Sequence, residues 1–244
     1  MSGPVLELRD VDAAYSSYRA LFGVSFSVPE GAIVALLGAN GAGKSTVARV
    51  ATGLLPASRG QVMVAGRDVT HVPAHRIARM GVAHVPEGRG VFAQLDVEEN
   101  LILALRRRVG RTGRTGLRVG LERAYEAFPV LAVRRRQMAG TLSGGEQRML
   151  SLAGVLASSP RLVVADELSL GLAPVVVDAV YEGLRRIHGL GVALLVVEQQ
   201  VGRALAIAQH AVVLVRGSVH WQGPPSQARA EMERLLSAGY APSN

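Results

Sequence analysis

The nine residues from Gly38 to Thr46 read GANGAGKST, which fits the pattern G-x-x-x-x-G-K-S/T. They follow an apolar run, Ile33–Leu37, that predicts a buried strand, and they precede a segment that predicts a helix. Glycines let the backbone curl so that successive N–H groups point at phosphate oxygens, and the start of the helix adds positive charge. The pattern therefore predicts a phosphate-binding loop.

Within this loop, Lys44 would contact the β- and γ-phosphates of a nucleotide, and the Ser45 hydroxyl would coordinate Mg²⁺. Of the 27 basic residues in the chain 26 are arginine, and the one lysine is Lys44. A lysine at this position favours a cramped site that calls for a compact ammonium. The alternative is an ordinary glycine-rich turn. The residues expected to contact the nucleotide are Gly38, Asn40, Gly41, Ala42, Gly43, Lys44, Ser45 and Thr46.

A second segment, Leu162–Glu167, is an apolar run that ends in two carboxylates. Asp166 can hold the Mg²⁺ that bridges the phosphates, and Glu167 can polarise the attacking water as a general base. Paired acids after a buried strand are common, so this segment alone is a weak signal. Together with the phosphate-binding loop, it indicates nucleotide hydrolysis rather than binding alone.

A third segment, Leu142–Gln147, reads LSGGEQ and begins 24 residues before Asp166. Its simplest interpretation is a glycine-rich helix start with Ser143 as the N-cap. The segment also resembles the signature of the ATP-binding subunits of ABC transporters, which reads LSGGQ or LSGGEQ. The resemblance implies a dimer that closes on two ATP molecules, with each signature on the ATP held by the other subunit's loop. The contacting residues would be Ser143, Gly144, Gly145 and Glu146.

The resemblance covers nearly the whole chain and assigns roles to three further residues. Tyr15 lies where the family stacks an aromatic ring on adenine, with a partly buried sheet tyrosine as the alternative. Glu87 lies where many members have a glutamine that reaches Mg²⁺ and the attacking water, and Gln199 lies where a histidine usually contacts the γ-phosphate. Because an amide cannot exchange a proton near neutral pH, Glu167 would be the only base near the water.

Shorter stretches narrow the resemblance to the LivF-type subunits of branched-chain amino acid importers. Asn40 and the stretches VPEGR, SLGLAP and VEQ usually read the same way in that group. In this chain the stretches are Val85–Arg89, Ser169–Pro174 and Val197–Gln199. Two departures are Leu168, where a proline normally follows the catalytic glutamate, and the run Arg148–Ser151 after the signature.

This group's function implies that the chain binds and hydrolyses ATP with Mg²⁺ to power uptake of branched-chain amino acids or related small amino acids and amides. The implied partners are a second ATPase subunit, either another copy or a LivG-type paralogue, transmembrane permease subunits and, indirectly, a solute-binding protein. A permease coupling helix would dock in a groove that includes the Glu87–Gln94 loop. No nucleic acid is expected as a partner.

The phosphate-binding loop and the two other segments lie among runs that predict strands and helices in alternation. This alternation predicts an α/β protein with a parallel sheet. Helical periodicity without a convincing strand fills residues 95–160. The other expected helices are 45–54, 175–188, 203–208 and 227–237, the last followed by a frayed end. The expected strands are 5–9, 24–28, 33–37, 60–66, 162–165, 193–197 and 211–215.

The resemblance implies a P-loop NTPase of the ABC ATPase fold. Such a fold has a RecA-like core, an N-terminal antiparallel β subdomain and an α-helical signature subdomain. Within a single domain of residues 1–244, the core and the β subdomain would occupy 1–86 and 161–222. The helical subdomain would occupy 87–160, and a C-terminal helix and tail would occupy 223–244.

The composition favours a soluble chain in a reducing compartment. The 244 residues include no cysteine, which excludes a disulfide framework and thiolate metal sites. No apolar run approaches the roughly 18 residues needed to span a bilayer, and no secretory segment precedes Val5. We therefore expect a cytoplasmic location, peripheral on the cytoplasmic face of the cell membrane.

The formal net charge of +8 equals the excess of ten arginines over two glutamates between Arg106 and Arg136. This stretch fits a solvated helical face, or a patch that meets anionic lipid, a partner or nucleic acid. A soluble ABC-type ATPase acting on nucleic acid or ribosomes is thus the alternative function. Such proteins usually carry two cassettes or a long coiled coil, whereas only 98 residues separate Lys44 from Leu142. A small-molecule kinase is a third possible function, which the signature segment disfavours because a kinase has no need of it.

Overall fold

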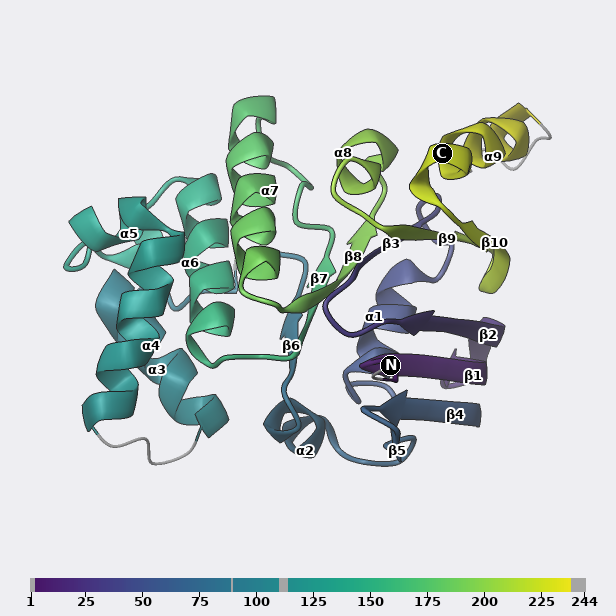
Figure 1. Cartoon of the computed structure of the whole chain (residues 1–244), viewed down its shortest axis with the longest axis horizontal. Coiled ribbons are helices and arrows are strands. Elements are labelled where there is room, and N and C mark those ends of the chain that lie inside the picture. The colour runs from purple at the N-terminus through teal and green to yellow at the C-terminus, as the bar shows by residue number, and fades with distance from the viewer. Residues whose placement is uncertain (1–2, 89, 110–113, 238–244) are drawn as a thin grey trace.

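The structure is a computed structural model that describes residues 3–88, 90–109 and 114–237. Strands and helices alternate along most of the chain, and a group of helices packs at one end of the molecule (Figure 1). Within the described ranges, no helix combines the length and the apolar character needed to cross a membrane. Arg89 and the frayed end expected at 238–244 lie outside the described residues.

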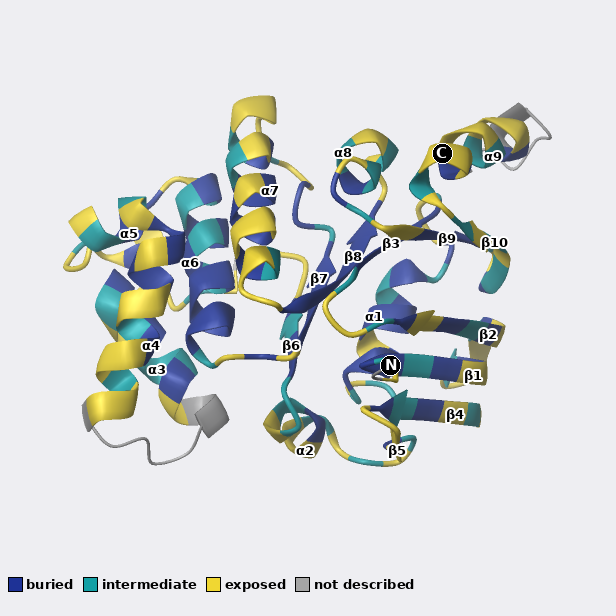
Figure 2. Ribbon diagram, viewed as in Figure 1, coloured by how far each residue is buried: buried dark blue, intermediate teal, exposed yellow. Residues whose placement is uncertain are grey.

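A sheet of six strands forms the centre of the molecule, in the order β10-β9-β3-β8-β7-β6. All neighbouring strands are parallel except β10, which pairs antiparallel with β9. Strands β3, β7 and β8 are buried over their whole length (Figure 2). The strands are β3 (Ile33–Leu37), β6 (Val82–Val85), β7 (Leu162–Asp166), β8 (Ala193–Glu198), β9 (His210–Val215) and β10 (Ser218–Gly223).

Successive residues of each central strand point into two different cores, as the two-residue period of a strand requires. In β3, Ile33, Ala35 and Leu37 belong to one hydrophobic cluster, and Val34 and Leu36 belong to the other. Because both faces of the sheet are covered, these strands are continuous apolar runs without polar alternation.

The smaller core lies between the central sheet and an antiparallel sheet of four strands, in the order β2-β1-β4-β5. Helix α1 (Lys44–Ala51) contributes Val47 to this core, beside Leu8 and Val62 from the antiparallel sheet. The strands are β1 (Leu6–Tyr15), β2 (Tyr18–Val28), β4 (Arg59–Val64) and β5 (Arg67–Asp68). Helix α1 is therefore held between two sheets, and the loop that precedes it is anchored on both sides.

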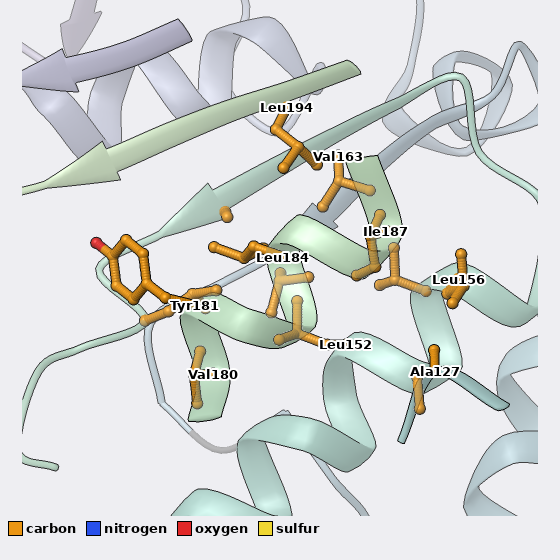
Figure 3. Packing of buried hydrophobic residues seen from close by; sticks show 14 of the residues in the cluster. Ala127, Leu152, Leu156, Val163, Val180, Tyr181, Leu184, Ile187 and Leu194 are labelled. Atoms are coloured by element: carbon orange, nitrogen blue, oxygen red, sulfur yellow. The ribbon is translucent and has the colours of Figure 1, made fainter. Parts of the chain in front are cut away.

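The larger core lies on the opposite face of the central sheet, under α7 (Pro174–Gly189) and α6 (Gly144–Ala157). Leu184 and Ile187 of α7 lie between Val163 and Leu194 of the sheet and Leu152 of α6 (Figure 3). The other helices are α2 (Ala74–Arg79), α3 (Val97–Val109), α4 (Arg114–Ala127), α5 (Pro129–Val133), α8 (Val201–Leu205) and α9 (Pro225–Ser237), with a 3₁₀ turn, η1 (Ala139–Thr141).

The structure confirms the predicted α/β fold with an antiparallel sheet, a parallel sheet and a helical segment. The expected helix at 203–208 begins earlier, at Val201, and ends at Leu205. Four elements were not predicted, namely β5, β6, β10 and α2. Strands β5 and β10 have no buried side chain and α2 has one, so their apolar pattern is weak, and β6 is a strand of only four residues. The division of the chain into subdomains stays a prediction.

The tight packing of α7 predicts opposite effects for two glycines of that helix. A Cβ at Gly183 would lie 2.4 Å from Cε1 of Phe128, whereas a Cβ at Gly189 would meet nothing within 4 Å. Alanine in a helix is favoured over glycine by about 1 kcal/mol, while overpacking costs about 1–3 kcal/mol. We expect Gly183→Ala to lower the free energy of unfolding and Gly189→Ala to leave it unchanged or raise it. Urea denaturation of both variants measures the difference, and equal effects would contradict this packing.

Candidate nucleotide-binding site

The parallel strands bring the predicted catalytic segments to one edge of the central sheet. The phosphate-binding loop follows β3, Asp166 is the last residue of β7, and Glu198 is the last residue of β8. Leu37 is paired with Glu198, and Asp166 is paired with Val197, so the three strands end nearly level. Carboxyl ends of neighbouring parallel strands are the usual place for a ligand in an open α/β sheet.

Glycines shape the loop from Gly38 to Thr46. Gly41 and Gly43 have positive φ angles of 76° and 99°, and a Cβ at Gly38 would lie 2.5 Å from the carbonyl oxygen of Leu214. Gly43 is the N-cap of α1 and offers no side-chain acceptor to the first turn of the helix. The N–H groups of that turn are therefore free of a side-chain cap and can donate hydrogen bonds to an anion.

Lys44 lies inside this loop and is 3% exposed. Its Nζ donates a hydrogen bond to the carbonyl oxygen of Ala39 at 3.1 Å and lies 3.2 Å from Oε1 of Glu167. The ammonium group therefore bridges the phosphate-binding loop and the residue predicted to be the general base. Asn40 and Gly41 are exposed at the tip of the loop, whereas Ala42 and Thr46 are buried.

Ser45 and Asp166 form the part of the site that suits Mg²⁺. The Ser45 hydroxyl donates a hydrogen bond to Oδ1 of Asp166 at 3.1 Å. Adjacent ligands of an octahedral Mg²⁺ with bonds of 2.0–2.1 Å lie about 2.9 Å apart, so these oxygens have suitable chemistry and spacing. The described residues contain no cluster of three or more His, Cys, Asp or Glu for a metal, and Mg²⁺ at phosphate sites needs only one or two protein oxygens.

Burial raises the pKa of Asp166 to about 6, and the carboxylates of Glu167 and Glu87 add to this rise. The hydrogen bond from Ser45 and the charge of Lys44 act in the opposite direction. Ser45 and Lys44 thus do not offset the effect of burial on this carboxylate, and a cation beside it would lower its pKa again.

Glu167 has an unusual backbone conformation for a residue with a side chain. Its φ angle is 47°, in the left-handed region, and its N–H donates to the carbonyl oxygen of Val197 at 2.9 Å. The next residue, Leu168, is 1% exposed and belongs to the larger core. Strain of this kind persists only where the surroundings fix the backbone, and it is concentrated at functional sites.

Glu87 follows β6 and is exposed. It lies beside a cavity of about 280 Å³ that is also lined by Gly144, Arg148 and the loop 170–172. Because the charge of Glu87 contributes to the pKa of Asp166, the two carboxylates are within electrostatic reach of each other. The cavity thus lies between the segment after β6, the start of α6 and the loop 170–172.

Ser143 caps α6, as the simplest interpretation of the signature segment predicts. Its Oγ accepts from the N–H of Glu146 at 3.3 Å, and the Glu146 carboxylate accepts from the Ser143 N–H at 2.9 Å. Burial raises the pKa of Glu146, but hydrogen bonds from Ser143 and the charge of Arg134 outweigh burial and lower it overall. Ser143 is exposed, whereas a Cβ at Gly145 would overlap Cγ1 of Val176. The helix start is thus a rigid, solvent-facing element.

Tyr15 and Gln199 lie at the margins of the site. Tyr15 ends β1 and is 36% exposed, and its hydroxyl accepts a hydrogen bond from Nη1 of Arg49 at 2.9 Å. The ring is thus a partly buried tyrosine at the end of a strand, and the Arg49 guanidinium lies over it, 5.7 Å from the ring centroid. Gln199 follows β8 directly and is exposed. No contact in the described part of the chain assigns either residue a chemical role.

Two charged residues at the site were not singled out from the sequence. Glu198 is 2% exposed and accepts hydrogen bonds from the N–H and the hydroxyl of Ser169, at 3.1 and 2.7 Å. Burial raises the pKa of Glu198, although the Ser169 hydrogen bonds oppose this effect. Arg148 is 4% exposed and lies in the run that departs from the usual signature continuation. The sequence signal that could have pointed to Glu198 is its position as a charged residue at the end of the apolar run of β8.

Comparison with known proteins places these features in a family context. A family model described as ABC transporter matches residues 21–169. The high-affinity branched-chain amino acid transport ATP-binding protein BraG of Pseudomonas aeruginosa is 40% identical over 215 residues, which cover 88% of this chain and 91% of BraG. A probable branched-chain amino acid transport ATP-binding protein, LivF of Archaeoglobus fulgidus, is 34% identical over 218 residues, covering 89% of this chain and 91% of LivF.

A solved structure has the same fold. It is an ATP-binding cassette of an ABC transporter in its ADP conformation, with a TM-score of 0.83 and 23% identity. The match covers 96% of this chain and 95% of the solved chain. Because the match covers nearly all of both chains, the two proteins share the whole arrangement of sheets and helices.

The raised pKa of Asp166 predicts a pH dependence of stability. Its pKa of about 6 in the folded chain lies above the ordinary value of 3.8, so between these values the folded state binds more protons than the unfolded state. Stability therefore falls as the pH rises through this window. We expect Asp166→Asn to make this fall shallower in magnesium-free buffer, since the amide does not titrate. Buried Glu198 remains in the variant, so part of the fall is retained.

Urea denaturation of the wild type and the variant at several pH values between 4 and 7 measures this difference. Asp178→Asn is a suitable control, because Asp178 is an exposed residue of α7 outside the site. An Asp166→Asn curve that parallels the wild-type curve would contradict the assigned environment of this carboxylate.

Proposed function

The chain belongs to the ABC transporter family as an ATP-hydrolysing subunit, and we propose that it powers the uptake of branched-chain amino acids or related small amino acids and amides. The observation that carries the chemistry is the convergence of the phosphate-binding loop, Asp166 and Glu167 at one edge of the sheet. The transport role of BraG and LivF supports this substrate class.

In this proposal, the N–H groups of the loop and Lys44 bind the phosphates of ATP. Ser45 and Asp166, with Glu87 nearby, would hold Mg²⁺, and the ion would supply positive charge to the phosphate oxygens. Lys44 pairs with Glu167 in the structure, so phosphates that draw its ammonium away would release the Glu167 carboxylate. Glu167 then accepts a proton from the attacking water, and Gln199 donates a hydrogen bond to the γ-phosphate.

The signature segment serves a second subunit in this proposal. Ser143 caps the fourteen-residue helix α6 and faces solvent, so the positive end of that helix is open to the phosphates of a partner's ATP. The second subunit would be another copy or a LivG-type paralogue. Residues 87–160 would form the helical subdomain that carries this surface, and residues 1–86 and 161–222 would form the core that holds the nucleotide.

A second surface suits the permease. A cavity of about 410 Å³ lies between α2, the segment after β6, α3 and α6. Phe92, which is 48% exposed, and Leu103 give it an apolar wall, and His75 and Arg79 add polar groups at its side. An apolar wall with a few polar groups suits a short helix of a membrane subunit. The chain would then be peripheral on the cytoplasmic face of the membrane, with the solute-binding protein as an indirect partner.

The contacts of the arginine-rich stretch do not favour the nucleic-acid alternative. Arg134 lies 2.8 Å from Glu146, and the Arg135 guanidinium lies 4.3 Å from the ring centroid of Tyr125. Three further arginines make contacts within the chain: Arg118 to Glu122, Arg123 to Ser159, and Arg136 to Asp96 and Glu98. Five guanidinium groups of the stretch thus have a partner within the chain.

Two substitutions test the catalytic proposal. Glu167→Gln removes the general base, so we expect kcat for ATP hydrolysis to fall by about 100-fold or more, with ATP binding retained and a closed dimer favoured.

Lys44→Ala removes a charge from the phosphate pocket, so we expect the Kd for ATP to rise by roughly tenfold or more. Steady-state hydrolysis and titration with a fluorescent ATP analogue measure the two effects.

The two variants serve as controls for each other, because they change different steps. Substantial hydrolysis by Glu167→Gln would refute the role of that carboxylate. Normal binding of the analogue by Lys44→Ala would refute the assignment of the phosphate-binding loop.

The permease surface predicts a separate phenotype. Phe92→Ser would remove an aromatic side chain from the wall of the cavity, so we expect weaker copurification with coexpressed permease subunits. The basal ATP hydrolysis of the purified chain should stay within about twofold, because surface substitutions away from a site usually have small effects. Leu190→Ser, at an exposed position after α7, is the matched control. Equal copurification of the two variants would exclude this cavity as the docking surface.

A further inference from the structure

Arg148 connects three segments that lie far apart in the sequence. It belongs to the second turn of α6, five residues after Ser143, and is 4% exposed. Its Nη1 donates hydrogen bonds to the carbonyl oxygens of Pro86, at 3.0 Å, and of Gly88. Its Nη2 lies 3.5 Å from the carbonyl oxygen of Glu167, at the long limit of a hydrogen bond.

These acceptors flank or belong to two residues of the catalytic proposal. Pro86 and Gly88 are the neighbours of Glu87, so the guanidinium holds the backbone on both sides of that residue. The third acceptor is the main chain of Glu167 itself, whose left-handed φ angle requires support from its surroundings.

The charge of Arg148 is also placed among acids. Burial lowers the pKa of Arg148, and the carboxylates of Glu87, Glu198 and Asp166 oppose this effect. A guanidinium group keeps its charge under all ordinary conditions. A permanent positive charge therefore lies within electrostatic reach of these three carboxylates.

An arginine suits this position better than any other residue type. Its guanidinium is planar and carries five N–H donors in a fixed fork, whereas a lysine ammonium is a point charge on a flexible stem. The three acceptors come from two separate loops, and a fork can reach acceptors on different sides at once.

We propose that Arg148 is a positioning residue that ties the start of α6 to the backbone of Glu87 and Glu167. The helix that presents Ser143 and the two acidic residues then move as one unit. A shift of the signature end of α6 is thereby passed to the residues that hold the attacking water. This inference rests on the proposed ATP hydrolysis. The residue that connects α6 to the two acidic residues belongs to the run Arg148–Ser151, which departs from the family's usual sequence after the signature.

Three variants test the proposal in the purified chain. Arg148→Gln removes the charge and most of the donors, and Arg148→Lys keeps the charge but not the fork. Arg186→Gln is the matched control, because Arg186 also donates to a carbonyl oxygen, that of Ala127 at 3.0 Å, but lies outside the site on α7. The measurements are kcat and Kd for ATP, the Tm, and the hydrogen exchange of amides in residues 82–88 and 162–170.

We expect kcat to fall by roughly 10- to 100-fold in Arg148→Gln, as misplacement of catalytic groups by about 1 Å does. The Kd for ATP should stay within about threefold, since Arg148 does not belong to the phosphate-binding loop. Hydrogen exchange should rise in the two named segments and not across the core. Arg148→Lys should recover little of the loss, and Arg186→Gln should keep the wild-type kcat.

Several results would overturn the proposal. These are a wild-type kcat in Arg148→Gln, full recovery in Arg148→Lys, or an equal loss in Arg186→Gln. Faster exchange over the whole chain with a lower Tm would assign Arg148 a purely structural role. If Arg148→Gln does not fold, the lysine variant decides, because a wild-type kcat there would show that the fork is not needed. A wild-type chain without ATP hydrolysis would instead refute the proposed function.

Discussion

Because β3, β8 and β7 pair in parallel, three loops of different chemistry begin at the same edge of one sheet. The register of this pairing matters as much as its direction. All residues of β3 and β7 are buried, so a slip of β7 would draw the carboxylate of Asp166 between apolar strands, where an isolated charge is very costly. The two hydrophobic cores that cover the sheet thus hold the acids level with the phosphate-binding loop.

The electrostatics of this edge combine several acids with two cations of different kinds. Lys44 is a compact charge that contacts both the loop and Glu167, so it can change partners when a nucleotide binds. Arg148 is held by backbone carbonyl groups on two loops and is suited to stay in place. One cation can change partners, and the other is held in place.

The central strands and the phosphate-binding loop could be predicted because their signals are local. A fully buried strand is a continuous apolar run, and the bounds of β3 match the prediction. Strand β10 could not be predicted in this way, since it lies at the sheet edge with half-exposed side chains. The contacts of Arg148 also escape a local pattern, because Gly88 lies 60 residues earlier in the chain. Only the folded chain brings the segment of Pro86 and Gly88 within reach of α6.

Lys44 is the one lysine of the chain and is almost fully buried in its loop. Positive charge elsewhere on the protein comes from guanidinium groups, which acylating reagents and acetyltransferases do not modify as they modify amines. Acetylation of a side-chain amine is therefore confined to a single atom, the Nζ that faces Glu167. Acetylation there would remove the positive charge that faces Glu167 in the phosphate-binding loop and leave the charge of the surface unchanged.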